Sequence, residues 1–128
     1  MSDRILTSNS DESKIIEIQS MLGLSTKAAV IRICVALSLK NELNPVNGRE
    51  DLIRDNSGAN YHKFTIMGDD FEIYKAIFSS HIGKSLDDDE FFPTLFKAHL
   101  IRGLEILYSF SRLNPESEKI YSYLAKKI

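Results

Sequence analysis

The sequence has few of the residues that would mark a secreted, metal-binding or membrane protein. It contains one cysteine, no tryptophan, three prolines and six glycines in 128 residues. A single cysteine excludes both an internal disulfide framework and a zinc site built from several cysteines. No apolar stretch approaches the length of about 20 residues that a membrane-spanning helix needs, and no signal-peptide core follows Met1. We therefore expect a soluble, cytoplasmic protein.

An excess of charge of one sign is also missing. Sixteen Lys and Arg residues oppose eighteen Asp and Glu residues, which gives a net charge of −2. A domain that binds nucleic acid through its overall charge is usually strongly basic, so any anion-binding surface of this protein must be local. The length fits one domain, 1–128, with one hydrophobic core.

Apolar residues at helical spacing predict a mainly α-helical fold. The first helices are expected to form a helical hairpin over residues 11–40. Its first helix, 12–22, ends at Gly23, and Ser25 is the expected cap of the second. Asn44-Pro45 follows the second helix, since the residue before proline avoids the helical region.

The middle of the chain has few apolar residues and many turn-forming pairs. It predicts a long loop over 41–60, followed by a short strand and helices over 61–128. Alternating side chains predict a strand near 61–67, and a second short strand is expected near 4–7. A helix is expected from about Asp69 to Ile82.

Four consecutive acids, Asp87 to Glu90, precede a long apolar-striped helix that reaches Phe110. Acids at this position suit the positive end of a helix dipole. The opposite side of that helix carries Arg102, Glu105 and Arg112 and is expected to face solvent. An amphipathic segment, 116–128, ends the chain.

The segment 28–39 is apolar on nearly every side, and a helix of that kind must be surrounded by protein. In so short a chain we expect other copies to provide part of this cover, in a homo-oligomer. Arg32 lies inside the segment and needs a partner, either a carboxylate such as Glu17 or Glu105, or phosphate at an interface. Gly103 costs about 1 kcal/mol relative to alanine in a helix, so another backbone is expected to pass close to it.

Signatures of catalysis are absent from the sequence. His62, His81 and His99 lack the spacing of a helical zinc site, and the acids 87–90 lack that of a calcium loop. Cys34 lies in the apolar segment, where a buried thiol is inert. No glycine-rich phosphate loop or serine elbow is present. We therefore predict no catalytic residue, no metal and no cofactor.

Candidates for an anion-binding surface are scattered cations. They are Arg4, Lys14, Lys27, Arg49, Arg54 and Lys63. A few such side chains presented together suffice to bind phosphate, and symmetry would repeat them in every subunit. The aromatic residues of the last third of the chain are expected in the core or at a subunit contact, with base stacking as the alternative.

Three stretches resemble the DndE family, the small component of bacterial DNA phosphorothioation. They are the hairpin from Met21 into Ile31–Leu39, the segment Phe64–Asp69, and Phe96–Glu105. Within the last, Ala-His-x-x-Arg-Gly-x-Glu is the most specific. The resemblance covers about residues 4–112, and the chain beyond Asn114 lies outside it.

This resemblance implies a mainly helical homotetramer that binds duplex DNA, nicked duplexes included, through surface lysines. It implies a role in DNA sulfur modification, a restriction-modification type of system in which sulfur replaces one non-bridging phosphate oxygen. The implied partners are the other Dnd proteins, among them a sulfurtransferase-like component and an SMC-like ATPase. The lack of catalytic signatures agrees with an accessory, DNA-binding role.

Two other functions remain open on the sequence alone. Strand 4–7 followed by two helices is the order of a ribbon-helix-helix transcriptional regulator, in which Arg4 and Thr7 would reach base edges. The third hypothesis is an enzyme, either a metal-dependent DNA-nicking enzyme that uses the acids 87–90, or a thiol enzyme that uses Cys34.

Overall fold

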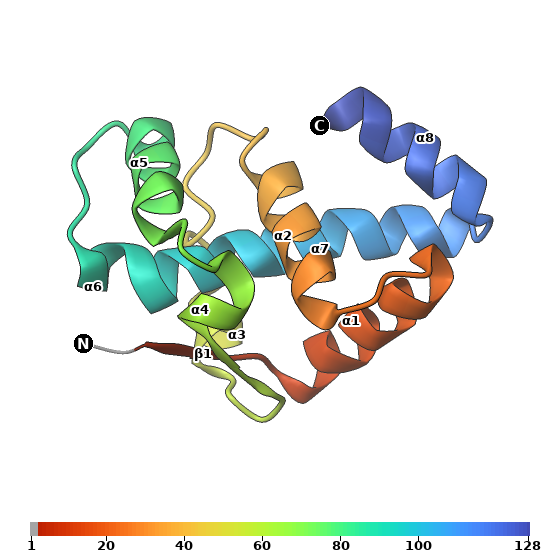
Figure 1. Cartoon of the computed structure of the whole chain (residues 1–128), viewed down its shortest axis with the longest axis horizontal. Helices are drawn as coiled ribbons and strands as arrows, with labels where there is room; N and C mark the ends of the chain where they lie inside the picture. The colour runs from red at the N-terminus through yellow and green to blue at the C-terminus, as the bar shows by residue number, and fades with distance from the viewer. Residues whose placement is uncertain (1–2) are drawn as a thin grey trace.

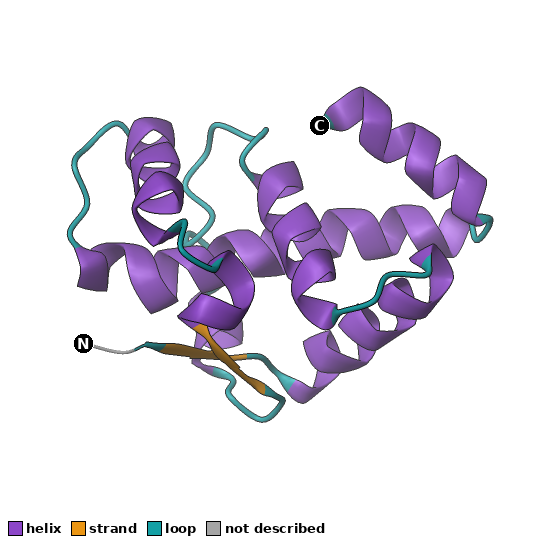
Figure 2. Cartoon of the chain, viewed as in Figure 1, coloured by secondary structure: helices purple, strands orange, loops and turns teal. Residues whose placement is uncertain are grey.

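The structure, a computed structural model, describes residues 3–128. The fold is mainly helical with one two-stranded sheet, as predicted (Figures 1 and 2). The elements are β1 (Arg4–Leu6), α1 (Asn9–Leu22), α2 (Lys27–Ser38), α3 (Glu50–Arg54), β2 (Asn60–His62), α4 (Lys63–Met67), α5 (Phe71–Ile82), α6 (Asp88–Glu90), the π-helical turn η1 (Phe91–Leu95), α7 (Phe96–Leu113) and α8 (Ser117–Lys127).

The two helices predicted over residues 11–40 are present as α1 and α2, with small shifts at their ends, but they are bent by 100° at the break and do not run antiparallel as in a hairpin. The Ser8 side chain caps α1 by accepting a hydrogen bond from the Asp11 N–H at 2.9 Å. Gly23 ends α1 with a φ of 65°, a conformation that favours glycine. The cap of α2 is Thr26 rather than Ser25, and its hydroxyl accepts from the Ala29 N–H at 3.2 Å.

Helix α2 crosses α7 in the centre of the molecule (Figure 1). The helices approach so closely that a Cβ added to Gly103 would lie 1.7 Å from the Cys34 carbonyl oxygen. The predicted close backbone is therefore confirmed. Val30, Ile31 and Cys34 are buried by the chain's own helices, so these three positions need no cover from another copy.

The predicted strand near 61–67 is only partly correct. β2 pairs antiparallel with β1, with Ile5 opposite Tyr61, but the strand ends at His62. The His62 ring accepts a hydrogen bond from the Phe64 N–H at 3.1 Å, which caps a helical turn over 63–67. Local capping therefore overrides the alternating pattern. As a result Phe64 is exposed while Ile66 is buried.

The region 41–60 contains one helical turn, α3, which the prediction of an uninterrupted loop missed. The C-terminal end of the region 41–60 lies beside the end of β1. There the Gly58 N–H donates to the carbonyl of Thr7, the residue after β1, at 2.7 Å. A Cβ on Gly58 would lie 2.5 Å from the Ser8 carbonyl oxygen, so only glycine fits there.

The acidic run 87–90 is a helix cap, as its position predicted. The Asp87 side chain accepts from the Glu90 N–H, and the Glu90 side chain accepts from the Asp87 N–H. The aromatic residues that follow form core, which agrees with the first of the two predictions for them. Phe78 stacks on Phe96 at 5.6 Å between ring centroids, and both are buried with Phe91.

Helix α8 covers the C-terminal half of α7 and the end of α1. Its Ile120 is buried, and Ser117 and Tyr121 donate hydrogen bonds to the carbonyls of Met21 and Leu22. Phe110 and Tyr123 stack with ring centroids 4.1 Å apart. The predicted amphipathic segment is thus a docked helix.

Among residues 3–128, no single helix is long and apolar enough to cross a bilayer. The pair α1 and α2 has the required length and composition only when both are counted together, and they are bent by 100°.

Candidate nucleic-acid interface

The six cations predicted to bind DNA do not form one surface. Each has at least one interaction within the chain, and the type of that interaction separates cations that hold the fold together from cations that face solvent. Only two of the six, Arg4 and Arg54, line the same cavity.

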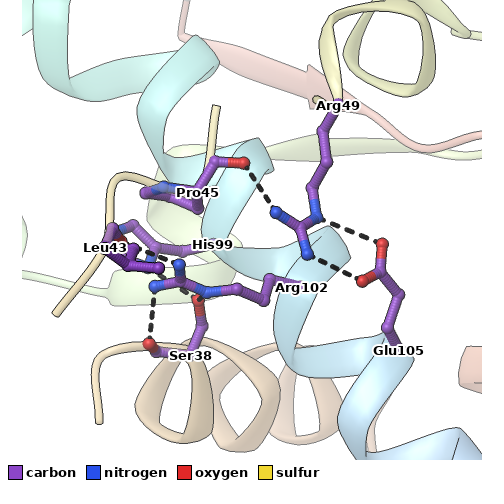
Figure 3. Close-up of polar contacts among 7 residues, drawn as sticks. All are labelled: Ser38, Leu43, Pro45, Arg49, His99, Arg102 and Glu105. Atoms are coloured by element: carbon purple, nitrogen blue, oxygen red, sulfur yellow. Dashed lines mark hydrogen bonds and ion pairs between the residues drawn. The ribbon is translucent and has the colours of Figure 1, made fainter. Parts of the chain in front are cut away.

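Arg49 is a structural clamp (Figure 3). Its guanidinium donates two hydrogen bonds to the Glu105 carboxylate, at 2.9 and 3.1 Å, and one to the Pro45 carbonyl at 3.1 Å. This paired geometry is the strongest that arginine makes with a carboxylate. Arg49 therefore fastens the loop after α2 to α7, and its donors are not directed at an outside ligand.

Lys27 belongs to a partly buried network. Its ammonium lies 2.8 Å from a carboxylate oxygen of Glu12. The same carboxylate accepts hydrogen bonds from Thr7 at 2.9 Å and from Tyr61 at 2.7 Å. Burial favours the neutral acid, but the bonds from Lys27, Tyr61 and Thr7 outweigh it and lower the pKa of Glu12. The network joins the residue after β1 to α1, α2 and β2.

Lys63 and Lys14 are half-buried, like Lys27. Lys63 lies 3.1 Å from a carboxylate oxygen of Asp3 and 4.7 Å above the centre of the Phe71 ring. Lys14 lies 5.2 Å from the centre of the Tyr108 ring, and the Arg112 guanidinium lies 5.8 Å from the same ring. Lys14 and Arg112 therefore form a small cationic group on α1 and α7, away from Lys63.

Arg4 and Arg54 line a cavity of about 330 Å³ between β1, α3 and η1. Arg4 donates to the Asn60 side chain at 3.4 Å, and Arg54 pairs with Asp51. Both arginines are exposed. A third cation, Lys97, lies on the inner side of the same cavity. Among the residues 3–128 that line it, none is Asp or Glu. Two of the six predicted cations, Arg4 and Arg54, thus line this cavity together.

Lys97 is a functional candidate that the sequence did not indicate. It is buried, and its ammonium donates to the carbonyls of Ile53 and Asp55 at 2.6 and 2.8 Å and to the Asn56 side chain at 2.9 Å. Burial lowers the pKa of Lys97, while nearby Asp55 opposes this effect. Lys97 fixes the segment after α3 and places a positive charge behind Arg4.

Arg102 is the second buried cation, and its predicted exposure is wrong (Figure 3). It donates to the Ser38 hydroxyl and carbonyl, both at 2.8 Å, and to the Leu43 carbonyl at 2.7 Å. The Ser38 carbonyl lies at the C-terminal end of α2, where the helix dipole favours a cation, and Leu43 lies in the loop that follows. Glu105, three residues further along α7, pairs with Arg49.

Arg32 shows the opposite error. It was expected inside the apolar segment with a carboxylate partner or with phosphate at an interface, but it is exposed and donates to the Ile66 carbonyl at 3.0 Å. The helix turns this one polar position outward, so no buried charge needs a partner. Neither Glu17 nor Glu105 pairs with it, since they contact Arg112 and Arg49.

The sequence contained no direct signal for the two buried cations. Residues 96–104 of α7 are buried on every side, yet Lys97, His99 and Arg102 give this stretch the appearance of an amphipathic helix. The sequence feature that pointed to a close helix contact here is Gly103, which lies where the backbone of α2 contacts α7.

Other chemistry finds little support in the described residues. In residues 3–128 no three or more His, Cys, Asp or Glu side chains converge on a possible metal position. Cys34 is fully buried, which raises its pKa and leaves a thiol rather than a thiolate. Thr7, one of the two base-reading residues of the regulator hypothesis, is buried and donates to Glu12, whereas Arg4, the other, is exposed.

Comparison with known proteins identifies the family of the chain. The model of the family described as DNA sulphur modification protein DndE matches residues 4–115. The match spans β1 through α7 and leaves out α8. No curated protein and no solved structure matches the chain. Because the family match covers most of the 128 residues, the protein belongs to the DndE family of DNA sulphur modification proteins.

Proposed function

We propose that the protein is a non-catalytic, DNA-binding accessory subunit of the DNA phosphorothioation machinery, acting in the cytoplasm. Membership of the DndE family supports its place in DNA sulfur modification. The observation that carries DNA binding is the cavity shared by Arg4, Arg54 and Lys97, with no carboxylate among its described lining residues. Phosphate groups are the anions that such a local cluster would meet on duplex DNA.

A non-catalytic role is supported by the state of the only thiol. Carrying sulfur requires an accessible thiolate, whereas Cys34 is buried behind the α2–α7 contact. In this proposal the sulfur chemistry belongs to other Dnd proteins, a sulfurtransferase-like component and an SMC-like ATPase. This subunit holds the DNA for them.

Assembly as a homotetramer is part of the proposal. The outer side of α5 exposes Ile73 and Ile77, one helical turn apart, and the neighbouring α4 exposes Phe64. Exposed apolar side chains of this size support a contact with another protein surface. Four copies would repeat the Arg4 and Arg54 cavity and so multiply the phosphate contacts. A solution mass of one chain at every concentration, with and without DNA, would contradict the tetramer.

The DNA-binding proposal is tested by salt titration with an intact duplex and with the same duplex carrying one nick. Each phosphate neutralised should contribute about −0.9 to the slope of log affinity against log salt. We expect the double variant Arg4→Ala/Arg54→Ala to bind more weakly and to lose roughly two units of that slope per subunit engaged.

The matched control is Lys119→Ala/Lys126→Ala, which removes two exposed cations of α8, outside the family match. It should keep nearly the whole slope. Duplex binding that does not depend on salt, or an equal loss in the two double variants, would overturn the assignment of DNA contact to Arg4 and Arg54.

A further inference from the structure

Helix α5 is apolar on two sides, and the chain covers one of them. On the inner side, Phe71 and Phe78 pack against Phe91, with ring centroids 5.1 and 4.9 Å apart. On the outer side, Ile73 and Ile77 are 59% and 48% exposed. Figure 1 shows α5 far from α8, and in this fully described helix Phe78 is the only buried residue. A helix that is apolar on two sides needs protein against both.

The exposed side of α5 is one uncharged stripe with opposite charges beyond its two ends. The stripe consists of four exposed residues at the helical spacing i, i+3, i+4 and i+7, namely Ile73, Ala76, Ile77 and Ser80. Asp69 precedes the helix, Lys84 follows it, and both are exposed.

The stripe is complementary to itself when a second copy runs antiparallel to it. From Asp69 to Lys84 its positions lie 4, 3, 1, 3 and 4 residues apart, a spacing that is the same from either end. In a two-fold contact, residue i meets residue j and residue j meets residue i. Antiparallel pairing therefore sets Ile77 against Ala76 of the other copy. It likewise sets Ile73 against Ser80, so that a large side chain meets a small one throughout, as close helix packing requires.

Charge favours the same orientation. Antiparallel pairing brings Asp69 of one copy toward Lys84 of the other at both ends of the contact. Lys84 lies 2.7 Å from Glu90 in its own chain, but these side chains are 57% and 41% exposed, so Lys84 remains able to interact with a second carboxylate. Exposed ion pairs add little affinity, yet they select the orientation in which opposite charges meet. Antiparallel helix dipoles favour it as well.

We propose that α5 packs antiparallel against α5 of a second copy of this chain, across a two-fold axis between Ala76 and Ile77. The inference rests on the proposed function, which includes a homo-oligomer. It adds the helix that forms one contact, its orientation and its register. A tetramer built on two-fold axes needs a second kind of contact too, so loss of the α5 contact should leave dimers.

The first test is a disulfide between copies. In the proposed register the two Ala76 positions lie beside the axis, so Ala76→Cys should give covalently linked dimers under mild oxidation. Cys34 is buried and should not take part. The matched control is Ala125→Cys, which replaces an exposed alanine of α8. Equal yields of linked dimer from the two variants would overturn the proposal.

The second test removes one large side chain from the stripe. Ile77→Ala should raise the dissociation constant of self-association about a hundredfold, because each two-fold contact loses two isoleucine side chains. Leu113→Ala is the control, since Leu113 ends α7 and is 82% exposed. Sedimentation equilibrium measures both variants. An unchanged dissociation constant for Ile77→Ala would overturn the proposal.

The third test reverses the charges at the ends of the stripe. Asp69→Lys and Lys84→Asp should each weaken self-association about tenfold, and the double variant Asp69→Lys/Lys84→Asp should recover most of the loss. The Lys84–Glu90 pair is lost in the double variant as in Lys84→Asp, so recovery comes from the contact between copies. A double variant that associates no better than the two single variants would overturn the antiparallel register.

The outcomes also separate this inference from the proposed function. A wild-type protein with the mass of one chain at every concentration, with and without DNA, would overturn the homo-oligomer and the α5 contact together. A wild-type oligomer that Ile77→Ala leaves intact would overturn the α5 contact alone. Halving of the oligomer mass by Ile77→Ala, with the duplex still bound in a salt-dependent manner, would support both.

Discussion

The buried cations of α7 and the exposed arginines beside β1 carry the same charge but use their hydrogen-bond donors differently. Arg102 directs its guanidinium at carbonyls of the α2 end and of the loop at Leu43, and Lys97 directs its ammonium at the segment after α3. Arg4 donates to the exposed side chain of Asn60, and Arg54 pairs with the exposed side chain of Asp51. The direction of the hydrogen-bond donors, rather than the residue type, therefore distinguishes a structural cation from a cation that can contact a ligand.

The largest expected effect is a loss of stability on removing a buried structural cation, Arg102. Arg102→Met would keep much of the side-chain volume but remove four hydrogen bonds, one to the Ser38 hydroxyl and three to the carbonyls of Ser38, Asn41 and Leu43. The Ser38 carbonyl would still accept from the Asn41 N–H, whereas the Leu43 carbonyl would lose the donor described for it. Buried groups left unpaired cost about 1–3 kcal/mol each, so we expect a loss of roughly 3 kcal/mol in the free energy of unfolding. Urea unfolding followed by circular dichroism measures this.

A stability loss below about 1 kcal/mol would mean that water replaces the guanidinium at the α2 end. The control is Arg112→Met on the exposed side of the same helix, where Arg112 lies 3.8 Å from Glu17. An exposed pair of this kind contributes about 0–1 kcal/mol, so the control should change stability little.

The second prediction concerns His99, the neutral neighbour of Arg102. Its Nδ1 lies 2.8 Å from the Ser38 hydroxyl, and in the described chain its Nε2 has no hydrogen-bond partner. Burial, with His81 and Arg102 adding to it, lowers the pKa of His99 from 6.5 to about 3. In the unfolded chain the pKa returns to about 6.5, so the unfolded state binds the proton first as pH falls.

The stability that neutral His99 provides is therefore complete above about pH 6.5 and is lost as the pH falls toward about 3. Between about pH 7 and pH 5 we expect the free energy of unfolding to fall by about 2 kcal/mol from this group. The His99→Gln variant should lack this part of the pH dependence. The same fall in both proteins would show that His99 is not its source.

The sequence was sufficient for features set by local physics. Gly103 indicated a close backbone, and the carbonyl of Cys34 provides it. The acids 87–90 indicated a helix start, and Asp87 caps one. Both predictions hold because capping and glycine depend on neighbours along the chain or on contact at one atom.

The sequence was insufficient where burial depends on a distant segment. The position of Arg102 on a helical wheel suggests exposure, and only the end of α2 and the loop at Leu43 provide the carbonyls that allow its burial. Lys97 depends in the same way on residues 53–56, which carry no pattern of their own. Of the candidate site, Arg4 and Arg54 were predicted individually, whereas their convergence on one cavity needed the fold.

The smallest change in stability and the clearest functional readout come from comparing two arginines that lie five residues apart. Arg49→Ala removes the paired bonds to Glu105 and the bond to Pro45 and should cost about 1 kcal/mol of stability, with no change in the salt slope of DNA binding. Arg54→Ala removes only an exposed pair with Asp51 and should change stability by less than about 0.5 kcal/mol. It should nevertheless reduce the salt slope by roughly 0.9 for each subunit that contacts DNA, because one phosphate contact is lost. If both variants shifted the slope equally, hydrogen-bond direction would not distinguish the two kinds of cation, and Arg49 would have to leave Glu105 when DNA binds.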